Sequence, residues 1–413
     1  MNKETLNNLV TLARQQTVFY QHLYKHVPGE ISDLTELPVA THEKIMAIAH
    51  DAERVSDIFS VQHAHGMYYQ SSATTGKAKS TLFGRDDWCR TNTLLAEKHT
   101  ANKVMCAGDI VCNISVAGSA SFMAVHDIIN ISPSPCSEIP LGCDHDYQHI
   151  VSVCQQFNAN VISGVNSTLL GLACHLFKEH QTLPQIKRIW GGGELFYGAQ
   201  QQLLSRVFPD AVFIPFLYGT TEAGAIGYSK PGYAQNVFNT LDDSVIIENI
   251  DMKTGLKIVD CGVKGSAVIT NRLRLSAPAI RLDTGDFMEW VDPEGIPERR
   301  FSIHGRRYPK QWTVGETHFT ETDVIALLSA IEIEFDIIKF QLSLSKDRIT
   351  VIISLLNQNS EPDAVKKKLD HIFIMTENPV ARCLVRNNYV LSIVDIEYFT
   401  QLSKRKSKFI TEE

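Results

Sequence analysis

Apolar runs alternate with segments of helical spacing through the middle of the chain. Two segments, His145–Asn158 and Ser167–Glu179, repeat apolar residues at helical intervals, which is typical of helices that pack on one face. Strands that alternate with such helices predict an α/β sheet covered by helices. The expected strands are the buried apolar runs Asp109–Ser115, Asn160–Ser163, Gln185–Trp190 and Ala211–Leu217.

The regions before and after this alternating part of the chain have different patterns of apolar residues, and these patterns predict further subdomains. Residues 1–60 have helical spacing, with a turn at Leu37-Pro38. From residue 243 to 291 the pattern changes to short β-branched runs separated by Gly and Asp, which predicts a β-rich unit. The strands expected there are Ser244–Ile250, Ala267–Asn271 and Phe287–Val291.

A small α+β domain is predicted after residue 305. Thr320–Ile331 has helical spacing, and Thr320 is the expected N-cap, followed by acidic residues that suit the positive end of a helix. The next two apolar runs, Asp336–Leu344 and Arg348–Leu355, predict a hairpin. A helix is expected at Pro362–Phe373 and a strand at Tyr389–Ile396. We therefore expect an α/β fold with a large, multi-subdomain N-terminal domain at 1–305, made of helix-covered sheets and the β-rich unit. A small, mobile C-terminal domain would follow at 306–413, with a hinge near 305–310.

The composition is that of a globular protein and excludes several classes. The 413 residues contain 39 Lys plus Arg and 46 Asp plus Glu, a formal net charge of −7, with 44% hydrophobic and 21% charged residues. This balance excludes a disordered chain and a polybasic nucleic-acid binder, so we expect no nucleic-acid partner. A phosphate ligand would require positive charge that is local to its site.

Cysteine usage and hydropathy favour a soluble, cytoplasmic protein. The nine cysteines are scattered and form no CxxC pair, which favours reduced thiols over a disulfide framework. The first residues, Met1–Glu4, lack the apolar segment of a signal peptide. Residues 110–137 carry few charges, but His126, Asp127 and several serines interrupt them, which predicts buried core and no membrane partner.

Hydroxyl groups, a glycine and two lysines lie close together between Ser71 and Lys79. Such a segment can bind an anion through backbone N–H groups, hydroxyls and ammonium groups. It is not a Walker A loop, because Ser71 stands where the first glycine belongs and Ala78 follows Lys77. A solvated turn would explain the same composition. The candidate anion-binding residues are Ser71, Ser72, Thr74, Thr75, Gly76, Lys77 and Lys79.

Three further motifs carry possible ligand chemistry. Trp190-Gly191-Gly192-Gly193-Glu194 follows a predicted strand, and its glycines let a flat ring approach closely. Tyr218-Gly219-Thr220-Thr221-Glu222 also follows a strand; a tyrosine can stack on a base and a glutamate can bind Mg²⁺. Arg281-Leu282-Asp283-Thr284-Gly285-Asp286, followed by Gly305-Arg306, offers a carboxylate suited to ribose hydroxyls. Tight turns or an acidic helix N-terminus explain each motif when it is taken alone.

Together, the order and spacing of these motifs resemble the adenylate-forming superfamily of acyl- and aryl-CoA synthetases, and most of all its phenylacetate-CoA ligase-like branch. Ser71–Lys79 is similar to the family's phosphate loop, and Gly192-Gly193-Glu194-Leu195 to its adenine-side turn. Tyr218–Glu222 resembles the Tyr-Gly-x-Thr-Glu motif, and Pro278–Asp286 the segment that ends in the ribose-binding Asp. Leu37-Pro38-Val39-Ala40-Thr41-His42 is similar to an N-terminal Leu-Pro-x-Thr-x-Lys region, so the likeness spans nearly the whole chain.

The resemblance implies an AMP-forming acid–thiol ligase with ATP, Mg²⁺ and CoA. A carboxylate attacks the α-phosphate of ATP, and a thiol then displaces AMP. Thr74, Thr75, Gly76 and Lys77 would bind the β- and γ-phosphates with help from Lys79. Glu222 would bind Mg²⁺, and Thr221 would contact the α-phosphate or the substrate carboxylate. The residues implied at the nucleoside are Tyr218, Gly219, Thr220, Gly192, Gly193 and Glu194 at adenine, and Asp286 with Arg306 at the ribose.

Three features depart from the family pattern. Ala73 stands where the phosphate loop has glycine, and Pro309 restricts the backbone beside the hinge, so the pattern supports adenylation more strongly than the thioester step. The catalytic lysine of the family falls on Arg405 here, which leaves Lys404 and Lys406 as the alternatives.

By position, the acyl pocket is expected to be lined by Ala117, Gly118, Gly164 and Phe216, which would admit an aryl ring or an acyl chain. The enzyme is expected to act on a small carboxylic acid in specialised metabolism, with CoA or the phosphopantetheine of an acyl carrier protein as the acceptor. Whether the protein forms a homodimer stays open at this point. A second hypothesis is a ligase-fold accessory protein with lost or partial catalysis that partners a carrier protein. Carboxylate-dependent pyrophosphate release distinguishes the two.

Overall fold

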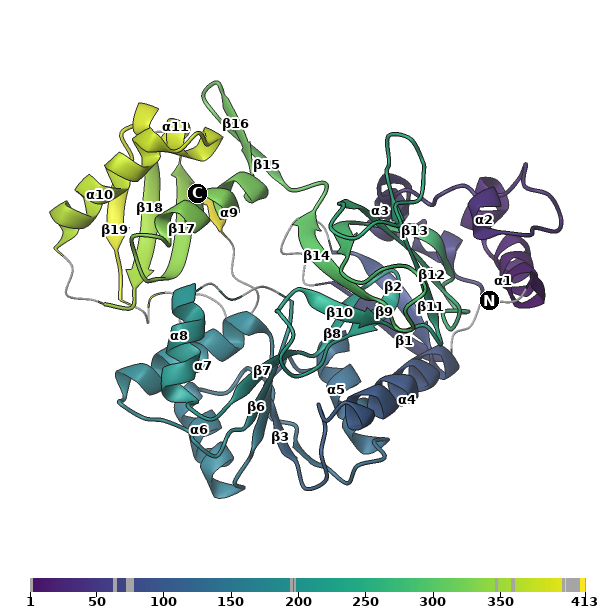
Figure 1. The fold of residues 1–413 in the computed structure, drawn as a ribbon, viewed down its shortest axis with the longest axis horizontal. Coiled ribbons are helices and arrows are strands. Elements are labelled where there is room, and N and C mark those ends of the chain that lie inside the picture. The colour runs from purple at the N-terminus through teal and green to yellow at the C-terminus, as the bar shows by residue number, and fades with distance from the viewer. Residues whose placement is uncertain are drawn as a thin grey trace. The chain divides into compact units, whose positions relative to one another are not determined.

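The chain divides into two compact units in the computed structural model, each of which is described by itself (Figure 1). The first unit contains Met1–Asp109, Gly118–Glu138 and Phe213–Arg307, and the second contains Ile110–Ala117, Ile139–Val212 and Tyr308–Glu413. The structure describes residues 3–61, 65–71, 78–193, 196, 198–345, 348–357, 361–395, 398 and 409–412.

Helix α2 of the first unit begins at a capping residue and is tied to the larger sheet. The Thr17 hydroxyl accepts a hydrogen bond from Tyr20 N at 3.2 Å and caps α2 (Val18–Leu23). The Tyr20 hydroxyl in turn accepts from Ile280 N at 2.9 Å, which fixes α2 beside the Arg281–Asp286 segment. None of the helices in the described part of the chain is long and apolar enough to cross a bilayer. The other helical elements are α1 (Lys3–Gln16), η1 (Leu34–Glu36), α3 (His42–Ala49), η2 (Val55–Ile58), α4 (Arg85–Ala101) and α5 (Ala120–Asn130), which confirms the helical prediction for much of 1–60.

Two antiparallel sheets complete the first unit. A hairpin pairs β1 (Gly66–Gln70) with β2 (Ser80–Gly84), and a larger sheet runs in the order β11-β12-β13-β14-β10-β9-β8. The strand predicted at Phe287–Val291 is the end of β13 (Ala279–Trp290), which therefore carries the whole Arg281–Asp286 motif. The remaining strands are β8 (Leu217–Thr220), β9 (Gly224–Tyr228), β10 (Val237–Thr240), β11 (Val245–Ile250), β12 (Gly265–Asn271) and β14 (Arg300–Arg306).

Parallel strands and helices alternate in the first part of the second unit, which confirms the mixed α/β prediction. β3 (Ile110–Asn113), β5 (Val161–Ser163) and β6 (Arg188–Gly191) pair in parallel. All residues of β5 are buried, as expected for a parallel strand covered on both faces. The predicted helices are α6 (Tyr147–Gln156) and α7 (Asn166–Lys178), and α8 (Gly198–Val207) follows β6.

The strand predicted at Ala211–Leu217 is wrong at its end. β7 (Val212–Pro215) stops at Pro215, which offers no N–H to a ladder, and β8 begins separately at Leu217. The chain passes between the two units within β7 and also within β4 (Ser137–Ile139).

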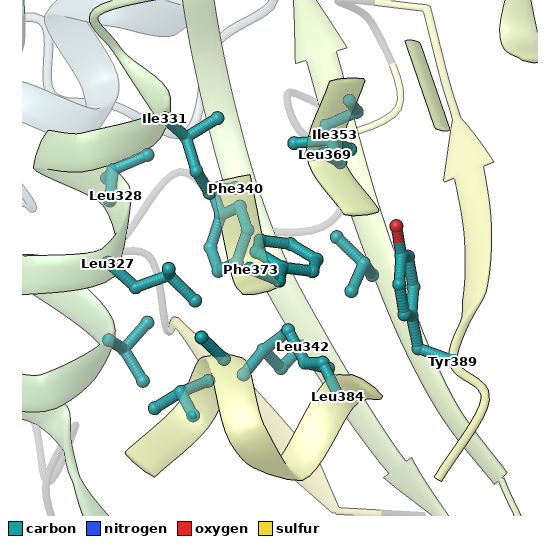
Figure 2. Packing of buried hydrophobic residues seen from close by; sticks show 14 of the residues in the cluster. Leu327, Leu328, Ile331, Phe340, Leu342, Ile353, Leu369, Phe373, Leu384 and Tyr389 are labelled. Carbon is teal, nitrogen blue, oxygen red and sulfur yellow. The ribbon is translucent and has the colours of Figure 1, made fainter. Parts of the chain in front are cut away.

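The C-terminal part of the second unit is built around a hydrophobic core of its own. Thr320 caps α9 (Glu321–Ile331) in a capping box with Asp323, as the sequence predicts. Figure 2 shows side chains of α9, β17, β18, α10 and α11 converging on this core, with Phe340 and Phe373 among them. The sheet order is β19-β18-β17-β20. The elements are β15 (Gln311–Val314), β16 (Thr317–Thr320), β17 (Ile337–Ser345), β18 (Arg348–Leu355), α10 (Pro362–Met375), α11 (Pro379–Arg386), β19 (Val390–Ile393) and β20 (Ile410–Glu412).

Candidate active site

A buried ion pair joins the end of the predicted phosphate loop to the Tyr218–Glu222 motif. Lys79 Nζ lies 2.8 Å from Glu222 Oε1, and the two side chains are 16% and 6% exposed. Burial alone would raise the pKa of Glu222, but the Lys79 ammonium, a backbone hydrogen bond and the Arg306 guanidinium together lower the pKa. The carboxylate is therefore charged at neutral pH.

Backbone and hydroxyl contacts close the base of the loop that precedes Lys79. Ser71 N donates to Lys79 O at 2.9 Å, and Lys79 N donates to Ser71 Oγ at 2.9 Å. These bonds extend the β1–β2 hairpin, so the hairpin positions Lys79. The other loop candidates, Ser72, Thr74, Thr75, Gly76 and Lys77, lie outside the described residues, and their phosphate contacts stay predictions.

Tyr218, Asp286 and Arg306 are linked across strands of the larger sheet. The Tyr218 hydroxyl donates to Asp286 Oδ2 at 2.7 Å, and Arg306 Nε lies 3.2 Å from Asp286 Oδ1. Asp286 and Arg306 are register partners on β13 and β14, so strand pairing sets their approach. The Tyr218 ring packs on Phe238 and Phe301, with centroid separations of 5.6 and 5.8 Å. Burial and the Asp286 charge raise the pKa of Tyr218, so its hydroxyl remains a donor.

The glycine before Asp286 allows His42 to enter the site. Gly285 has a φ of 77°, and a Cβ there would lie 2.7 Å from His42 Nδ1. The left-handed backbone and the close ring both require glycine. Sequence reasoning missed His42 as a site residue, although Gly285 marked a position of close approach.

A second buried ion pair lies beside the first group. Arg307 Nη2 is 2.6 Å from Asp283 Oδ2, and the side chains are 9% and 0% exposed. Asp283 Oδ1 also accepts from Gly285 N at 3.0 Å, and Arg307 N donates to Gly285 O at 2.7 Å. Sequence reasoning selected Asp286 and Arg306 and missed this pair. The signal in the sequence was that Asp283 lies shortly before Asp286 and that Arg307 directly follows Arg306.

The charges of these groups act on one another. After burial and Lys79, the Arg306 guanidinium also contributes to the lowered pKa of Glu222. Burial, then Lys79 and Arg306, lower the pKa of His42, while Glu222 and Asp283 oppose that shift. The structure therefore brings the residue predicted at the metal and those predicted at the ribose within electrostatic range of each other.

The Tyr218–Glu222 motif forms a strand and a turn between β8 and β9, and it does not begin a helix. A Cβ on Gly219 would lie 2.6 Å from Gly224 O, so glycine permits the close approach of the two strands. Thr220 Oγ1 accepts from Ala223 N at 3.0 Å and stabilises the turn that contains Thr221 and Glu222.

The adenine-side glycines belong to the second unit. β6 ends at Gly191, Gly192 O accepts from Asn166 N at 3.2 Å, and Gly193 has a φ of 85°. The glycines therefore follow a strand, as the sequence predicts. Glu194 lies outside the described residues, and the contact of these residues with adenine stays a prediction.

The acyl-pocket and lysine candidates stay predictions as well. Phe216 is buried and stacks on His99 of α4, with ring centroids 4.3 Å apart. Gly164 N donates to Trp190 O at 3.0 Å, Ala117 faces Gly142, and Gly118 has a φ of 74°. Lys404 and Lys406 lie outside the described residues.

The side chains of the first unit fit a magnesium nucleotide. A carboxylate offers about four lone-pair sites. Tyr218 and Arg306 each engage one oxygen of Asp286, so acceptor sites remain for ribose hydroxyls. Mg²⁺ is commonly held by one or two carboxylates together with substrate phosphates. Glu222 would be such a carboxylate once Lys79 exchanges its contact with Glu222 for a phosphate oxygen. Among the residues that the structure describes, no three His, Cys, Asp or Glu side chains are grouped to hold a metal ion.

Solved ligase structures resemble this chain. A 2-hydroxyisobutyryl-CoA ligase in its postadenylation state, in complex with 2-HIB-AMP, matches with a TM-score of 0.72 at 14% identity, over 99% of this chain and 88% of that chain. ATP-bound MatB from Rhodopseudomonas palustris matches with a TM-score of 0.54 at 14% identity, over 82% and 67%. The anthranilate CoA ligase AuaEII in complex with anthranoyl-AMP matches with a TM-score of 0.53 at 14% identity, over 79% and 62%.

Comparison of sequences adds no closer assignment. No protein-family model matches the chain, and a search of curated proteins found no match. The structural likeness extends over nearly the whole chain. Because the sequence identity is only 14%, this likeness shows the fold and nothing further. The chain has the fold of the adenylate-forming CoA ligases.

Proposed function

We propose that this protein is an ATP-dependent ligase that activates a small carboxylic acid as an acyl-adenylate and transfers the acyl group to a thiol. The observation that carries the proposal is the joint placement of the Lys79–Glu222 ion pair and the Tyr218–Asp286–Arg306 group in one unit of a chain with this fold. The Thr-Glu, Thr-Gly-Asp and Gly-Arg elements of the family pattern are all present, which favours an enzyme over an accessory protein without catalysis.

The proposed reaction requires charge neutralisation and positioning at the α-phosphate. A carboxylate oxygen of the acid attacks the α-phosphorus, the bond to the bridging oxygen breaks, and pyrophosphate leaves. Asp286 and Arg306 would hold the ribose, and Lys79 would exchange its contact with Glu222 for a phosphate oxygen. Mg²⁺ bound at Glu222 would neutralise phosphate charge. Such positioning and electrostatic stabilisation supply most of what nucleotidyl transfer needs from a protein.

Further parts of the proposal rest on the sequence. The division into a domain at 1–305 and a small domain at 306–413, with catalysis by Lys404 or Lys406, is part of it. The acceptor is CoA or a carrier-protein phosphopantetheine, and the phenylacetate-CoA ligase-like branch, a cytoplasmic location and a homodimer are also predictions. The likeness, at a TM-score of 0.60, to 2-hydroxyisobutyryl-CoA ligase in complex with 2-HIB-AMP and CoA in the thioesterification state supports CoA as the first acceptor to test.

A panel of acids tests the function. Full-length protein is incubated with ATP, Mg²⁺ and aryl, short-chain or long-chain acids, and pyrophosphate release is followed before CoA or a carrier protein is added for mass detection of the thioester. We expect carboxylate-dependent release that falls about 100-fold in Glu222→Gln, since groups that stabilise transition-state charge contribute this much. Glu294→Gln is the matched control, because Glu294 is an exposed carboxylate paired with Lys257 at 3.2 Å. Release that no acid stimulates would refute the ligase, and full activity in Glu222→Gln would refute the role of Glu222.

A further inference from the structure

A cavity of about 270 Å³ lies in the first unit, away from the residues assigned to the nucleotide. It opens at the ends of β10, β12 and β13 and along β11, and Thr240, Val245, Ile247, Arg272, Trp290 and Arg299 line it. Lys79, Tyr218, Glu222, Asp286 and Arg306 are not among its lining residues. The cavity therefore represents a second candidate binding site.

Part of the cavity lining is apolar. Val245, Ile247 and Trp290 are only 2%, 8% and 4% exposed, so their side chains form a fixed wall. Apolar cavities of about 150 Å³ accept a benzene ring. A volume of about 270 Å³ thus accommodates one ring or a branched chain together with one polar group.

Two guanidinium groups add positive charge to this wall. The Arg299 Cζ lies 4.0 Å from the Trp290 ring centroid, and its Nε and Nη2 donate at 2.6 Å to the carbonyls of Asp292 and Val259. Arg272 Nη2 donates to the Asp242 carbonyl, and its buried Nε has no hydrogen-bond partner among the described residues. In the part of the chain that the structure describes, both arginines bond to neutral carbonyls and neither forms an ion pair.

The carboxylates around the cavity are engaged elsewhere. Asp242 lines the cavity, but Thr240 Oγ1 donates to its Oδ1 and Glu298 N donates to its Oδ2 at 2.6 Å. Lys98 Nζ lies 2.6 Å from Glu298 Oε1, and Arg300 pairs with Asp292 in the same way at 2.6 Å. The lining therefore holds two guanidinium groups against one carboxylate whose oxygens both accept hydrogen bonds from the protein. This balance favours an anionic ligand.

We propose that this cavity binds a small organic monoanion with a compact apolar body, of the size and chemistry of benzoate. The carboxylate of the ligand receives hydrogen bonds from Arg272, whose planar guanidinium suits a carboxylate. The apolar body lies against Ile247 and Trp290. The proposal is independent of the ligase reaction, because it requires neither nucleotide nor turnover.

Calorimetric titration of the full-length protein without nucleotide tests the site. Benzoate and its neutral analogue benzamide are titrated at constant ionic strength into wild type, Arg272→Gln, Ile246→Trp and Arg206→Gln. Ile246 lines the cavity, so tryptophan there adds bulk to its lining. Arg206 is the matched control, because it is an exposed arginine of α8 that does not line the cavity.

We expect saturable benzoate binding and at least about tenfold weaker binding of benzamide, which lacks the charge. Arg272→Gln should weaken benzoate at least about tenfold and leave benzamide unchanged, while Ile246→Trp should abolish binding of both. Arg206→Gln should bind benzoate as wild type does. Absence of saturation below about 10 mM would overturn the proposal. Wild-type affinity in both Arg272→Gln and Ile246→Trp would also overturn it, because the benzoate would then bind elsewhere, the expected acyl pocket included.

Discussion

Replacing Lys79 with methionine would leave the Glu222 carboxylate buried without its cation. The Glu222 side chain is 6% exposed, and Lys79 Nζ lies 2.8 Å from its Oε1. Burial raises the pKa of Glu222, and Lys79 is the main group that lowers it. Removing one partner of a buried ion pair costs about 3–5 kcal/mol. Because the Lys79 side chain is itself 16% exposed, we expect a loss near the lower end, about 3 kcal/mol.

Calorimetric unfolding of wild type, Lys79→Met, Glu222→Gln and the double variant measures this loss. The double variant has no buried charge at the pair, so it should recover most of the stability lost in Lys79→Met. The pKa of Glu222 is lowered in the folded wild type. Its contribution to the free energy of unfolding is therefore complete above the pKa in the unfolded chain, about 4.3, and is lost as the pH falls through the pKa in the folded protein. In Lys79→Met the pKa of Glu222 should be raised, so the destabilisation is largest at neutral pH and shrinks on acidification.

Two results would refute this reasoning. Equal unfolding midpoints for wild type and Lys79→Met at neutral pH would mean that the ion pair does not offset the burial of Glu222. A double variant no more stable than Lys79→Met would mean that the loss comes from lysine packing and not from the unpaired carboxylate.

Three further predictions concern the neighbouring residues. Asp286→Asn keeps the size of the side chain but loses its charge, so the KM for ATP should rise at least about tenfold in acid-dependent pyrophosphate release, and an unchanged KM would contradict the ribose assignment. Gly285→Ala places a Cβ 2.7 Å from His42 Nδ1 at a φ of 77° and should cost about 1–3 kcal/mol of stability. A further His42→Ala change should restore part of it, and thermal midpoints equal to wild type would contradict the clash. Burial and Lys79 lower the pKa of His42, so stability should be lost as the pH falls below about 6.5, less so in His42→Asn. Parallel midpoint-against-pH curves would argue against that titration.

The candidate site was partly predictable because its motifs are local in sequence. Tyr218 and Glu222 lie in one short segment, and Asp286 and Arg306 are the last residues of two other short motifs. Strand pairing then brings Asp286 opposite Arg306, and the turn after Thr220 holds Glu222 where Lys79 meets it. A residue type and a short spacing were enough to select these side chains.

His42 and the Asp283–Arg307 pair could not be selected in this way. His42 N approaches Asp283 Oδ2 at 3.4 Å across a sequence separation of 241 residues. Nothing near His42 in the sequence indicates that contact, which depends on how α3 packs against β13. The break between β7 and β8 was missed for a similar reason: the apolar run is continuous, and only Pro215 marks its end. The sequence predicts which residues can do chemistry, whereas packing between distant segments decides which of them meet.

The central claim is that an acid carboxylate attacks the α-phosphate at the site formed by Lys79, Glu222 and Asp286. The most direct measurement uses an active acid labelled with ¹⁸O in its carboxylate, together with ATP, Mg²⁺ and a thiol, and analyses the AMP by mass spectrometry. Our account predicts AMP that carries one ¹⁸O, because the acyl–oxygen bond breaks when the thiol attacks and the bridging oxygen stays on the phosphate. Unlabelled AMP, or ¹⁸O in inorganic phosphate with ADP as the other product, would contradict it.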